Sequence, residues 1–539
     1  MHTTITSATT IGIDAHLVDV EVDLSLGLIN FFIVGLPDTA IKESRQRIQT
    51  ALKNSGVRLP ERKITVNLAP ADLKKEGTLF DLPIALGILH ASGNVKLSKE
   101  FLDETVIMGE LSLDGRIKPI KGALAIAYDA KRAGKSRIIV AYENAQEASI
   151  ITGLEVIGVK HLVELVTFLR HEKEIKPTVA PKISSQSRIK GIVDFAQVKG
   201  QHQAKRALQI AAAGQHNILF VGPPGSGKTM LAKRLPSIMP PMSFQEMLET
   251  SKIYSITGKL GTDPLVTQRP FRAPHHTISQ AGLVGGGSFP KPGEMSLAHN
   301  GILFLDELTE FKRTTLEVLR QPLEGKEVCI ARAQQVLTFP AGFVLVAALN
   351  PCPCGFLGDK TKDCVCPPHQ IERYLAKLSG PLLDRIDLQV NVQAVKYDTI
   401  TQKGVSYTSS QELSEGVDIA VEIQRKRLGP DTYNSVLTSD QVDQFCVLTQ
   451  PAQQLMKLAF EKLRLSMRGY HKVLRVARTI ADLDQSDIID KKHIQEAVMY
   501  RSLDQTLNRF KGTKHETTLT CTSLDRHKPL LGNRTNSVL

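Results

Sequence analysis

The chain has 539 residues, which exceeds the size of one hydrophobic core and predicts three or four domains. With 42% hydrophobic and 23% charged residues it has the composition of a globular protein, and no stretch reaches the roughly 20 apolar residues of a membrane helix. A net charge of +12 favours a polyanionic partner over general solubility charge, and the N-terminus lacks the pattern of a secretory signal, which predicts a cytoplasmic protein.

Residues 1–170 alternate between the period of a strand and that of a helix, which predicts a separate α/β or α+β domain. We expect strands at 18–24, 64–68 and 137–140, helices at 40–55, 82–91 and 122–133, and one hairpin over 106–120 with its turn at Asp114-Gly115.

The composition changes at three further points. Residues 171–190 are rich in Lys, Pro, Ser and Gln and predict a linker, and residues 191–393 form the next predicted domain. Residues 394–504 are helical in period, notably at 451–463 and 473–483. The basic segment 505–539 has few apolar residues and predicts a disordered tail.

One octapeptide defines the chemistry of the second domain. It matches the phosphate-binding pattern G-x-x-x-x-G-K-[ST], follows an apolar strand at 217–221 and precedes a helix at 230–235. Its backbone N–H groups suit phosphate oxygens, its lysine reaches the terminal phosphates and its threonine suits Mg²⁺. The predicted nucleotide-binding residues are Gly222, Pro223, Pro224, Gly225, Ser226, Gly227, Lys228 and Thr229.

The residues that ATP hydrolysis requires follow in order. A buried strand ends in Asp306 and Glu307, which suit a Mg²⁺ ligand and a general base. A second strand ends in Asn350, an amide that can orient water. Arg385 follows a short predicted helix and suits an arginine finger; a local ion pair with Asp384 or Asp387 is the alternative. A finger that acts on a second copy requires a ring or a dimer.

These residues, with the segments 272–277, 285–287 and 292–301, resemble the magnesium-chelatase-like branch of the AAA+ ATPases and, within it, the ComM/YifB family. The resemblance covers residues 1 to about 504. It implies an α/β AAA+ core with a parallel sheet, an α-helical lid, ATP and Mg²⁺ as cofactors, and a sensor 2 arginine in the lid. Arg475 matches that position best, with Arg478 as the alternative.

The same resemblance implies two additions that face the pore of a hexameric ring. Residues 277–294, which lack a helical period, match an insertion in the core, and residues 326–339 predict a hairpin. Arg332 and Lys326 are the candidate contacts to DNA phosphates, with a solvated hairpin as the alternative. His275 and His276 have no carboxylates nearby in sequence, so we interpret them as hydrogen-bonding or DNA-contacting residues rather than metal ligands.

Four of the seven cysteines lie within 15 residues, in two Cys-x-Cys pairs. Four thiols from two turns suit a closed tetrahedral zinc site, although the spacing departs from the usual C-x₂-C, and reduced cysteines without metal are the alternative. The candidate ligands are Cys352, Cys354, Cys364 and Cys366.

Residues 108–120 resemble the Lon protease domain, an S5-like α+β fold that also occurs in recombination proteins. Its serine–lysine dyad is missing: Phe80 and Ala125 stand at the matching positions, with Lys121 nearby. We therefore expect a non-proteolytic domain that serves assembly or DNA binding.

The resemblance implies an ATP-driven ring motor on branched or single-stranded DNA, a branch-migration helicase that promotes integration of DNA in natural transformation and homologous recombination. Two alternatives remain open at this point. A magnesium-chelatase subunit shares the core without needing the Lon-like domain, and a regulatory ATPase would remodel a protein partner.

Overall fold

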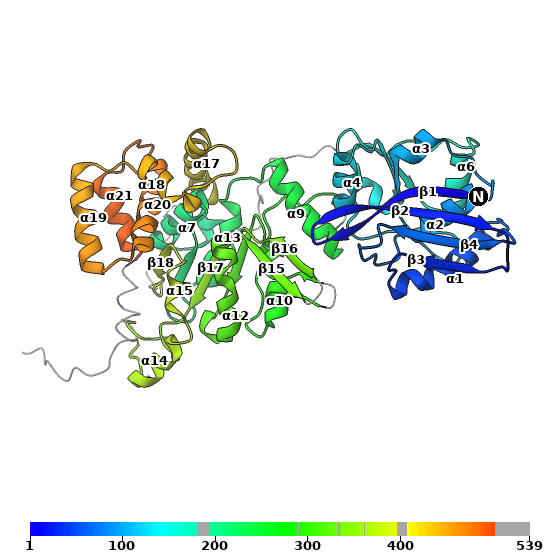
Figure 1. Ribbon diagram of the computed structural model, residues 1–539. Coiled ribbons are helices and arrows are strands. Elements are labelled where there is room, and N and C mark those ends of the chain that lie inside the picture. Colours follow the sequence, from blue (N-terminus) through cyan, green and yellow to red (C-terminus); the bar gives the residue numbers. More distant parts are fainter. Residues whose placement is uncertain are drawn as a thin grey trace, which may run out of the picture.

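The computed structural model describes residues 1–181, 193–261, 263–287, 290–332, 335–359, 362–395 and 407–501. The predicted tail 505–539 and residues 182–190 of the predicted linker lie outside these ranges. Three bodies follow one another in chain order, an N-terminal α/β body, a central α/β body and a C-terminal helical body (Figure 1). The predicted mixed α/β fold with a parallel sheet and a helical C-terminal region is confirmed.

The N-terminal body is built on a seven-stranded sheet in the order β3-β4-β2-β1-β5-β8-β9. Alternate residues of β2 are buried, from Val18 to Leu24, because successive side chains of a strand point to opposite faces. The strands are β1 (His2–Ile11), β2 (Asp14–Ser25), β3 (Phe31–Val34), β4 (Lys63–Ala69), β5 (Thr105–Ile107), β8 (Arg137–Ala141) and β9 (Glu155–Val159).

Helices complete this body. Almost every residue of α2 is buried, which places it in the core against β1 and β2. The helices are α1 (Thr39–Asn54), α2 (Asp81–Ala91), α3 (Lys99–Glu104), α4 (Ala123–Arg132), α5 (Tyr142–Ala148) and α6 (Leu162–Leu169).

The hairpin predicted over 106–120 is only partly correct. β5 belongs to the main sheet, where it pairs in parallel with β1 and β8. Only β6 (Glu110–Leu111) and β7 (Ile117–Lys118) form the antiparallel hairpin. The break follows from tertiary hydrogen bonds, because the N–H of Met108 donates to Ile139 and the N–H of Gly109 donates to Leu79.

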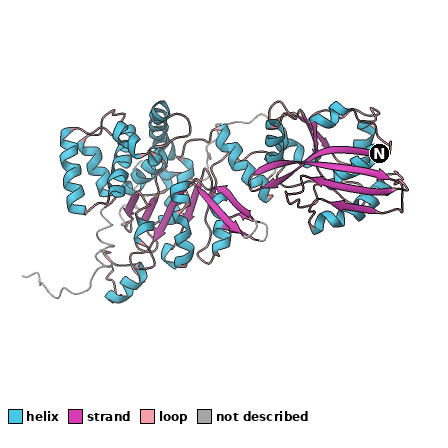
Figure 2. Ribbon diagram, viewed as in Figure 1, coloured by secondary structure: helices cyan, strands magenta, loops and turns pink. Residues whose placement is uncertain are grey.

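The central body holds a five-stranded sheet in the order β11-β14-β17-β10-β18, and every pair in it is parallel (Figure 2). All of its strands therefore end at one edge, where ligands bind in open parallel sheets. The strands are β10 (Ile218–Val221), β11 (Phe271–Arg272), β14 (Ile302–Leu305), β17 (Val344–Leu349) and β18 (Leu388–Asn391).

Helices of 4 to 14 residues accompany this sheet, and the helix predicted at 230–235 forms only in part, because α8 ends at Ala232. The helices are α7 (His202–Gly214), α8 (Lys228–Ala232), α9 (Phe244–Thr257), α11 (Glu294–Leu297), α12 (Arg313–Glu317), α13 (Pro322–Gly325), α14 (Pro368–Leu375) and α15 (Gly380–Leu383). The longest of them, α9, packs on α4 of the N-terminal body, and Leu248 and Leu265 join the hydrophobic core of that body.

The two predicted additions differ in outcome. The hairpin is confirmed as β15 (Glu327–Arg332) paired with β16 (Gln335–Pro340). The segment 277–294, whose sequence lacks a helical period and which we interpret as an insertion, contains α10 (Gln280–Val284) and a small ladder of β12 (Gly285–Gly286) with β13 (Lys291–Pro292). The helix forms because the Ser279 side chain caps it by accepting from the N–H of Gly282, a local signal that periodicity does not register.

The C-terminal body consists of helices that pack on α7 of the central body, and the two share one hydrophobic cluster. The predicted helices at 451–463 and 473–483 are confirmed within α19 and α20. The bounds are α17 (Ser410–Leu428), α18 (Ser439–Phe445), α19 (Gln450–Leu463), α20 (Met467–Leu483) and α21 (Lys491–Met499). Among the described residues, no helix has the length and apolarity that a membrane crossing requires.

Candidate functional site

The phosphate-binding loop lies where β10 ends and α8 begins, at the carboxyl edge of the central sheet. Glycine is required at Gly222, because a Cβ there would lie 2.0 Å from the carbonyl oxygen of Val392. Within the part of the chain that the structure describes, the buried hydroxyl of Ser226 has no hydrogen-bond partner. A buried hydroxyl without a partner is costly, and a phosphate oxygen at this loop would satisfy it.

Lys228 lies inside the curve of this loop and is only 8% exposed. Its ammonium donates to the carbonyl oxygens of Gly222 at 2.7 Å and Pro223 at 2.9 Å and to Oδ1 of Asn350 at 3.1 Å. Burial lowers the pKa of Lys228, while the carboxylates of Asp306 and Glu307 act in the opposite direction. The predicted lysine and the predicted sensor amide thus meet at one point.

The two predicted Mg²⁺ ligands are also in contact. The hydroxyl of Thr229 donates to Oδ2 of Asp306 at 2.6 Å, although 77 residues separate them in sequence. β14 delivers Asp306 to the same sheet edge as the phosphate loop, because β14 and β10 flank β17 in parallel. A hydroxyl and a carboxylate side by side are oxygen ligands of the kind that Mg²⁺ prefers.

Glu307 adjoins this pair but turns toward a histidine. Its Oε2 lies 3.5 Å from Nδ1 of His276, and its backbone has a left-handed φ of 51°. His276 packs edge-on against Phe311 and tilts against His275. No carboxylate lies near His276 in sequence, but the fold brings Glu307 to it from 31 residues away. His275 bonds instead to the hydroxyl of Thr277.

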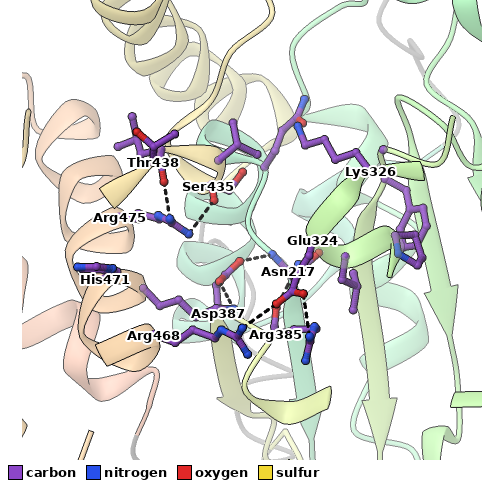
Figure 3. Close-up of a pocket in the computed structure, with 18 of the residues that line it drawn as sticks. Asn217, Glu324, Lys326, Arg385, Asp387, Ser435, Thr438, Arg468, His471 and Arg475 are labelled. Atoms are coloured by element: carbon purple, nitrogen blue, oxygen red, sulfur yellow. Dashed lines mark hydrogen bonds and ion pairs between the residues drawn. The ribbon is translucent and has the colours of Figure 1, made fainter. Parts of the chain in front are cut away.

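The predicted arginines lie at the other edge of the sheet, in a pocket of about 520 Å³ (Figure 3). Residues that line it precede three strands: Asn217 before β10, Phe343 before β17 and Asp387 before β18. Each strand spans at least four residues at about 3.3 Å per residue, so Arg385 and Lys228 face opposite edges. Arg475 of α20 lines the same pocket.

Arg385 forms an ion pair in this pocket, but with a different partner from those predicted. Its Nη2 lies 2.8 Å from Glu324, which also pairs with Arg468 at 3.0 Å. Asp387 pairs instead with Lys472 of α20 at 2.7 Å. The sequence pattern could not have indicated Glu324, because the pair joins residues 61 positions apart.

Arg475 is held by backbone oxygens. It donates to the carbonyls of Ser435 and Leu437, which fix the guanidinium beside the pocket (Figure 3). Arg478, the alternative, is buried on the same helix and pairs with Asp482 at 3.0 Å. In the described residues, the buried Nε atoms of Arg385 and Arg475 have no hydrogen-bond partner.

The candidate DNA contacts occupy opposite ends of the hairpin. Lys326 lies at its base and lines the arginine pocket, where burial lowers its pKa. Arg332 ends β15, next to the turn, and its side chain lies outside the described part of the structure. In the N-terminal body, Phe80 and Ala125 are fully buried, so neither position offers a nucleophile or a base.

The four cysteines form a compact cluster after Asn350. Their sulfur atoms all lie within 4.8 Å of one another, and those of Cys352 and Cys354 are 3.3 Å apart. Burial raises the pKa of the Cys352 thiol to about 12. The N–H of Phe356 lowers the pKa of Cys354 to about 6.

Sequence reasoning identified the phosphate loop, its two acids and the sensor amide, all of which the structure brings together. It missed His276 as a partner of Glu307, and it missed Glu324 and Arg468 in the arginine pocket. The only sequence signal for Arg468 was its spacing from Arg475. The two residues lie seven positions apart on α20 and therefore on one face of that helix.

Comparison with known proteins gives matches along most of the chain. Family models described as "Subunit ChlI of Mg-chelatase", "Magnesium chelatase, subunit ChlI" and "Magnesium chelatase, subunit ChlI C-terminal" match residues 20–144, 194–400 and 407–501.

Similar proteins span nearly the same length. The chain is 43% identical to uncharacterized protein YifB of Escherichia coli over 501 residues, which are 92% of this chain and 96% of that protein. It is 43% identical to competence protein ComM of Haemophilus influenzae over 509 residues, 94% of this chain and 98% of that protein. A shorter match is to Lon protease 2 of Bacillus subtilis. The two proteins are 33% identical over 127 residues, which are 23% of this chain and 22% of that protein.

Proposed function

We infer that this chain, which belongs to the YifB and ComM family of magnesium-chelatase-like AAA+ proteins, is an ATP-hydrolysing ring motor that acts on DNA. The observation that carries this proposal is the division of the ATP-hydrolysis residues between two opposite edges of one sheet. Lys228 and Asp306 lie at one edge, whereas Arg385 and Arg475 lie at the other. A complete site then forms only where one copy places its arginine edge against the phosphate loop of the next.

In this proposal the phosphate half of the site is formed by one subunit. The loop N–H groups and Lys228 bind the phosphates, and Thr229 with Asp306 holds Mg²⁺, which neutralises charge on the phosphate oxygens. Asn350 orients the attacking water, and Glu307 accepts its proton. The unpaired hydroxyl of Ser226 and the contacts of Lys228 fit this assignment.

The other half comes from the neighbouring subunit. Arg385 and Arg475, which line one pocket at this edge, bring two fixed positive charges to the phosphate oxygens. Such a heterologous contact repeats from copy to copy and closes into a ring, for which we propose six subunits. An arginine supplied by a neighbour typically contributes a factor of about 10³ to 10⁵ in rate.

We propose DNA as the substrate of the motor. The net charge of +12 suits a polyanion, and one relative that matches almost the whole chain is a competence protein. The β15–β16 hairpin is the element we assign to the DNA strand, with Arg332 and Lys326 as contacts. Branch migration of recombination intermediates in the cytoplasm, during natural transformation, is the activity we assign to it. The N-terminal domain then serves assembly or DNA binding without proteolysis.

The test is ATP hydrolysis and branch migration on a synthetic four-way junction. We expect DNA to stimulate the wild-type ATPase and Lys228→Ala to abolish both activities. Lys233→Ala, which removes an exposed lysine at the end of the same helix, is the matched control. An ATPase without DNA stimulation or branch migration would contradict the DNA assignment. Metal insertion into a porphyrin with partner subunits would establish a chelatase instead, and ATP-dependent remodelling of a bound protein would establish a regulatory ATPase.

The shared site has its own test. Lys228→Ala and Arg385→Ala should each be inactive alone. When the two are mixed in equal amounts, roughly a quarter of the interfaces pair an intact lysine with an intact arginine, and ATPase activity should return. A mixture that stays inactive while still forming mixed rings would show that Arg385 does not act between subunits.

A further inference from the structure

We propose that Cys352, Cys354, Cys364 and Cys366 bind one structural Zn²⁺, and that this ion holds the segment after Asn350 against the phosphate loop. The geometry of the cysteines alone supports the proposed metal site. Its influence on nucleotide binding rests on the proposed ATPase function.

The sulfur positions fit a single tetrahedral ion. Four sulfurs at about 2.3 Å from one zinc lie about 3.8 Å apart. The sulfur of Cys352 lies 3.3 Å from that of Cys354 and 3.5 Å from that of Cys364, and those of Cys354 and Cys364 are 3.6 Å apart. The fourth, Cys366, accepts from the N–H of Cys354 at 3.3 Å, an interaction that orients ligands of this kind.

The donor set selects the metal and its role. Four soft thiolates in tetrahedral array favour zinc over Mg²⁺ or Ca²⁺, which prefer oxygen. Four protein ligands leave no coordination position for water or substrate, so the ion is structural. The cysteines are all unbridged thiols, and Cys352 is fully buried in the hydrophobic cluster that includes Ile371 and Leu375 of α14. The site therefore joins the loop to α14.

The residues that flank the first cysteine pair lie against the phosphate loop. Gly355 follows Cys354, and a Cβ added to it would lie 2.5 Å from Cδ of Pro224. Two residues before Cys352, Asn350 accepts from Lys228 at 3.1 Å. Both ends of the first Cys-x-Cys turn thus contact the phosphate loop, one through Pro224 and the other through Lys228.

A metal that fixes this turn would fix both contacts. Without it, the contacts that the structure describes between the cysteines of the two Cys-x-Cys pairs involve only sulfur atoms and the N–H of Cys354, and such contacts are weak hydrogen bonds. We therefore expect loss of zinc to weaken ATP binding and to misplace Asn350, while the hydrophobic clusters of the central sheet hold the rest of the domain together.

The metal site is tested by composition. Full-length protein purified without chelator should contain one zinc per chain by plasma mass spectrometry, and substitution with Co²⁺ should give the visible absorption of a tetrahedral thiolate complex. The double variant Cys354→Ser with Cys364→Ser should lose the metal. Cys446→Ser, in the helical body, should keep it. Protein without zinc, with iron in its place, or with undiminished zinc in the double variant would overturn the proposal.

The coupling is tested by two glycines of the same loop. Gly355→Ala introduces a contact with Pro224, whereas Gly358→Ala adds a Cβ that meets nothing within 4 Å; both glycines have positive φ, 86° and 77°. We expect Gly355→Ala to raise the KM for ATP at least fivefold while retaining one zinc, and Gly358→Ala to resemble wild type. If the two variants change the KM for ATP equally, the proposed coupling between the zinc site and ATP binding is wrong. That result would not bear on the metal site itself, because zinc content is measured separately. A chain that binds zinc but no ATP would contradict the proposed function alone.

Discussion

Nδ1 of His276 lies 3.5 Å from Oε2 of Glu307, so the proposed general base is paired with a side chain from the segment that leads into the α10 insertion. The pair links the catalytic edge of the sheet to an element that we assign to the pore. Glu307 also has a left-handed backbone, a conformation that costs about 1 kcal/mol or more in a residue other than glycine. The carboxylate is therefore held in a specific position that a movement of the insertion would change.

We expect His276→Ala to raise ATP hydrolysis without DNA by a few fold and to reduce the further stimulation by DNA. The physical reason is that the carboxylate of Glu307 loses the partner that keeps it turned toward the insertion. Steady-state ATPase assays with and without DNA measure both quantities. His275→Ala is the control, because its ring bonds to Thr277. If His276→Ala and His275→Ala have the same rates, the pair does not control Glu307.

Glu324 pairs with both Arg385 and Arg468 and is about half exposed, with 48% of its side chain accessible. Replacing it by Gln leaves both arginines without their anion and should increase attraction for the phosphates of a neighbouring subunit. An ion pair at this exposure contributes no more than about 1 kcal/mol, so the KM for ATP should fall up to about fivefold. The measurement is ATPase rate against ATP concentration. Glu327→Gln, three residues later, should leave the KM as it was, and a raised KM in Glu324→Gln would contradict the assignment.

The sequence was sufficient to predict a structural element or a site residue wherever one short segment contains the whole pattern. The loop at Lys228 was predictable because strand, glycine-rich loop and helix are consecutive, and the 326–339 hairpin because its strands adjoin. It was insufficient where partners come from distant segments. No local pattern couples His276 to Glu307 or Arg385 to Glu324, and the split of the segment at 106–120 depends on bonds from Met108 and Gly109 to other elements.

The helical body is joined to the central sheet by the buried pair of Lys472 and Asp387, 2.7 Å apart. Burial tends to raise the pKa of Asp387, but Lys472 and His216 outweigh it and hold this pKa below its ordinary value. Lys472→Met leaves a buried carboxylate without its main partner, which typically costs about 3–5 kcal/mol. Urea unfolding should show this loss, whereas Lys491→Met, at an exposed position of α21, should show little.

The pH dependence of this pair has a defined sign. The folded protein binds a proton at Asp387 less readily than the unfolded chain does. The pair therefore stabilises the fold at pH values above the unfolded pKa of about 3.8. This stabilisation is lost as the pH falls through the folded pKa. Wild-type stability should therefore fall on acidification below about pH 4, and Lys472→Met should show a smaller fall. An equal acid dependence in the two proteins would show that Asp387 is not stabilised by Lys472.

The contact between the N-terminal and central bodies contains Glu147 of α5, which accepts from the hydroxyl of Ser255 on α9 at 3.4 Å. Burial is the main reason that its pKa rises to about 7. The folded state therefore binds this proton more readily than the unfolded chain, whose pKa is about 4.5. Stability from Glu147 is fully present below about pH 4.5 and is lost as pH rises through about 7. One pKa unit corresponds to about 1.4 kcal/mol, so the loss is at most about 3 kcal/mol.

Glu147→Gln keeps the neutral form at every pH, and its thermal midpoint should exceed that of wild type at pH 8 but match it at pH 5. Glu143→Gln, exposed on the same helix, serves as control. A wild-type protein whose midpoint does not fall relative to Glu147→Gln between these two pH values would show that Glu147 is charged in the folded state throughout.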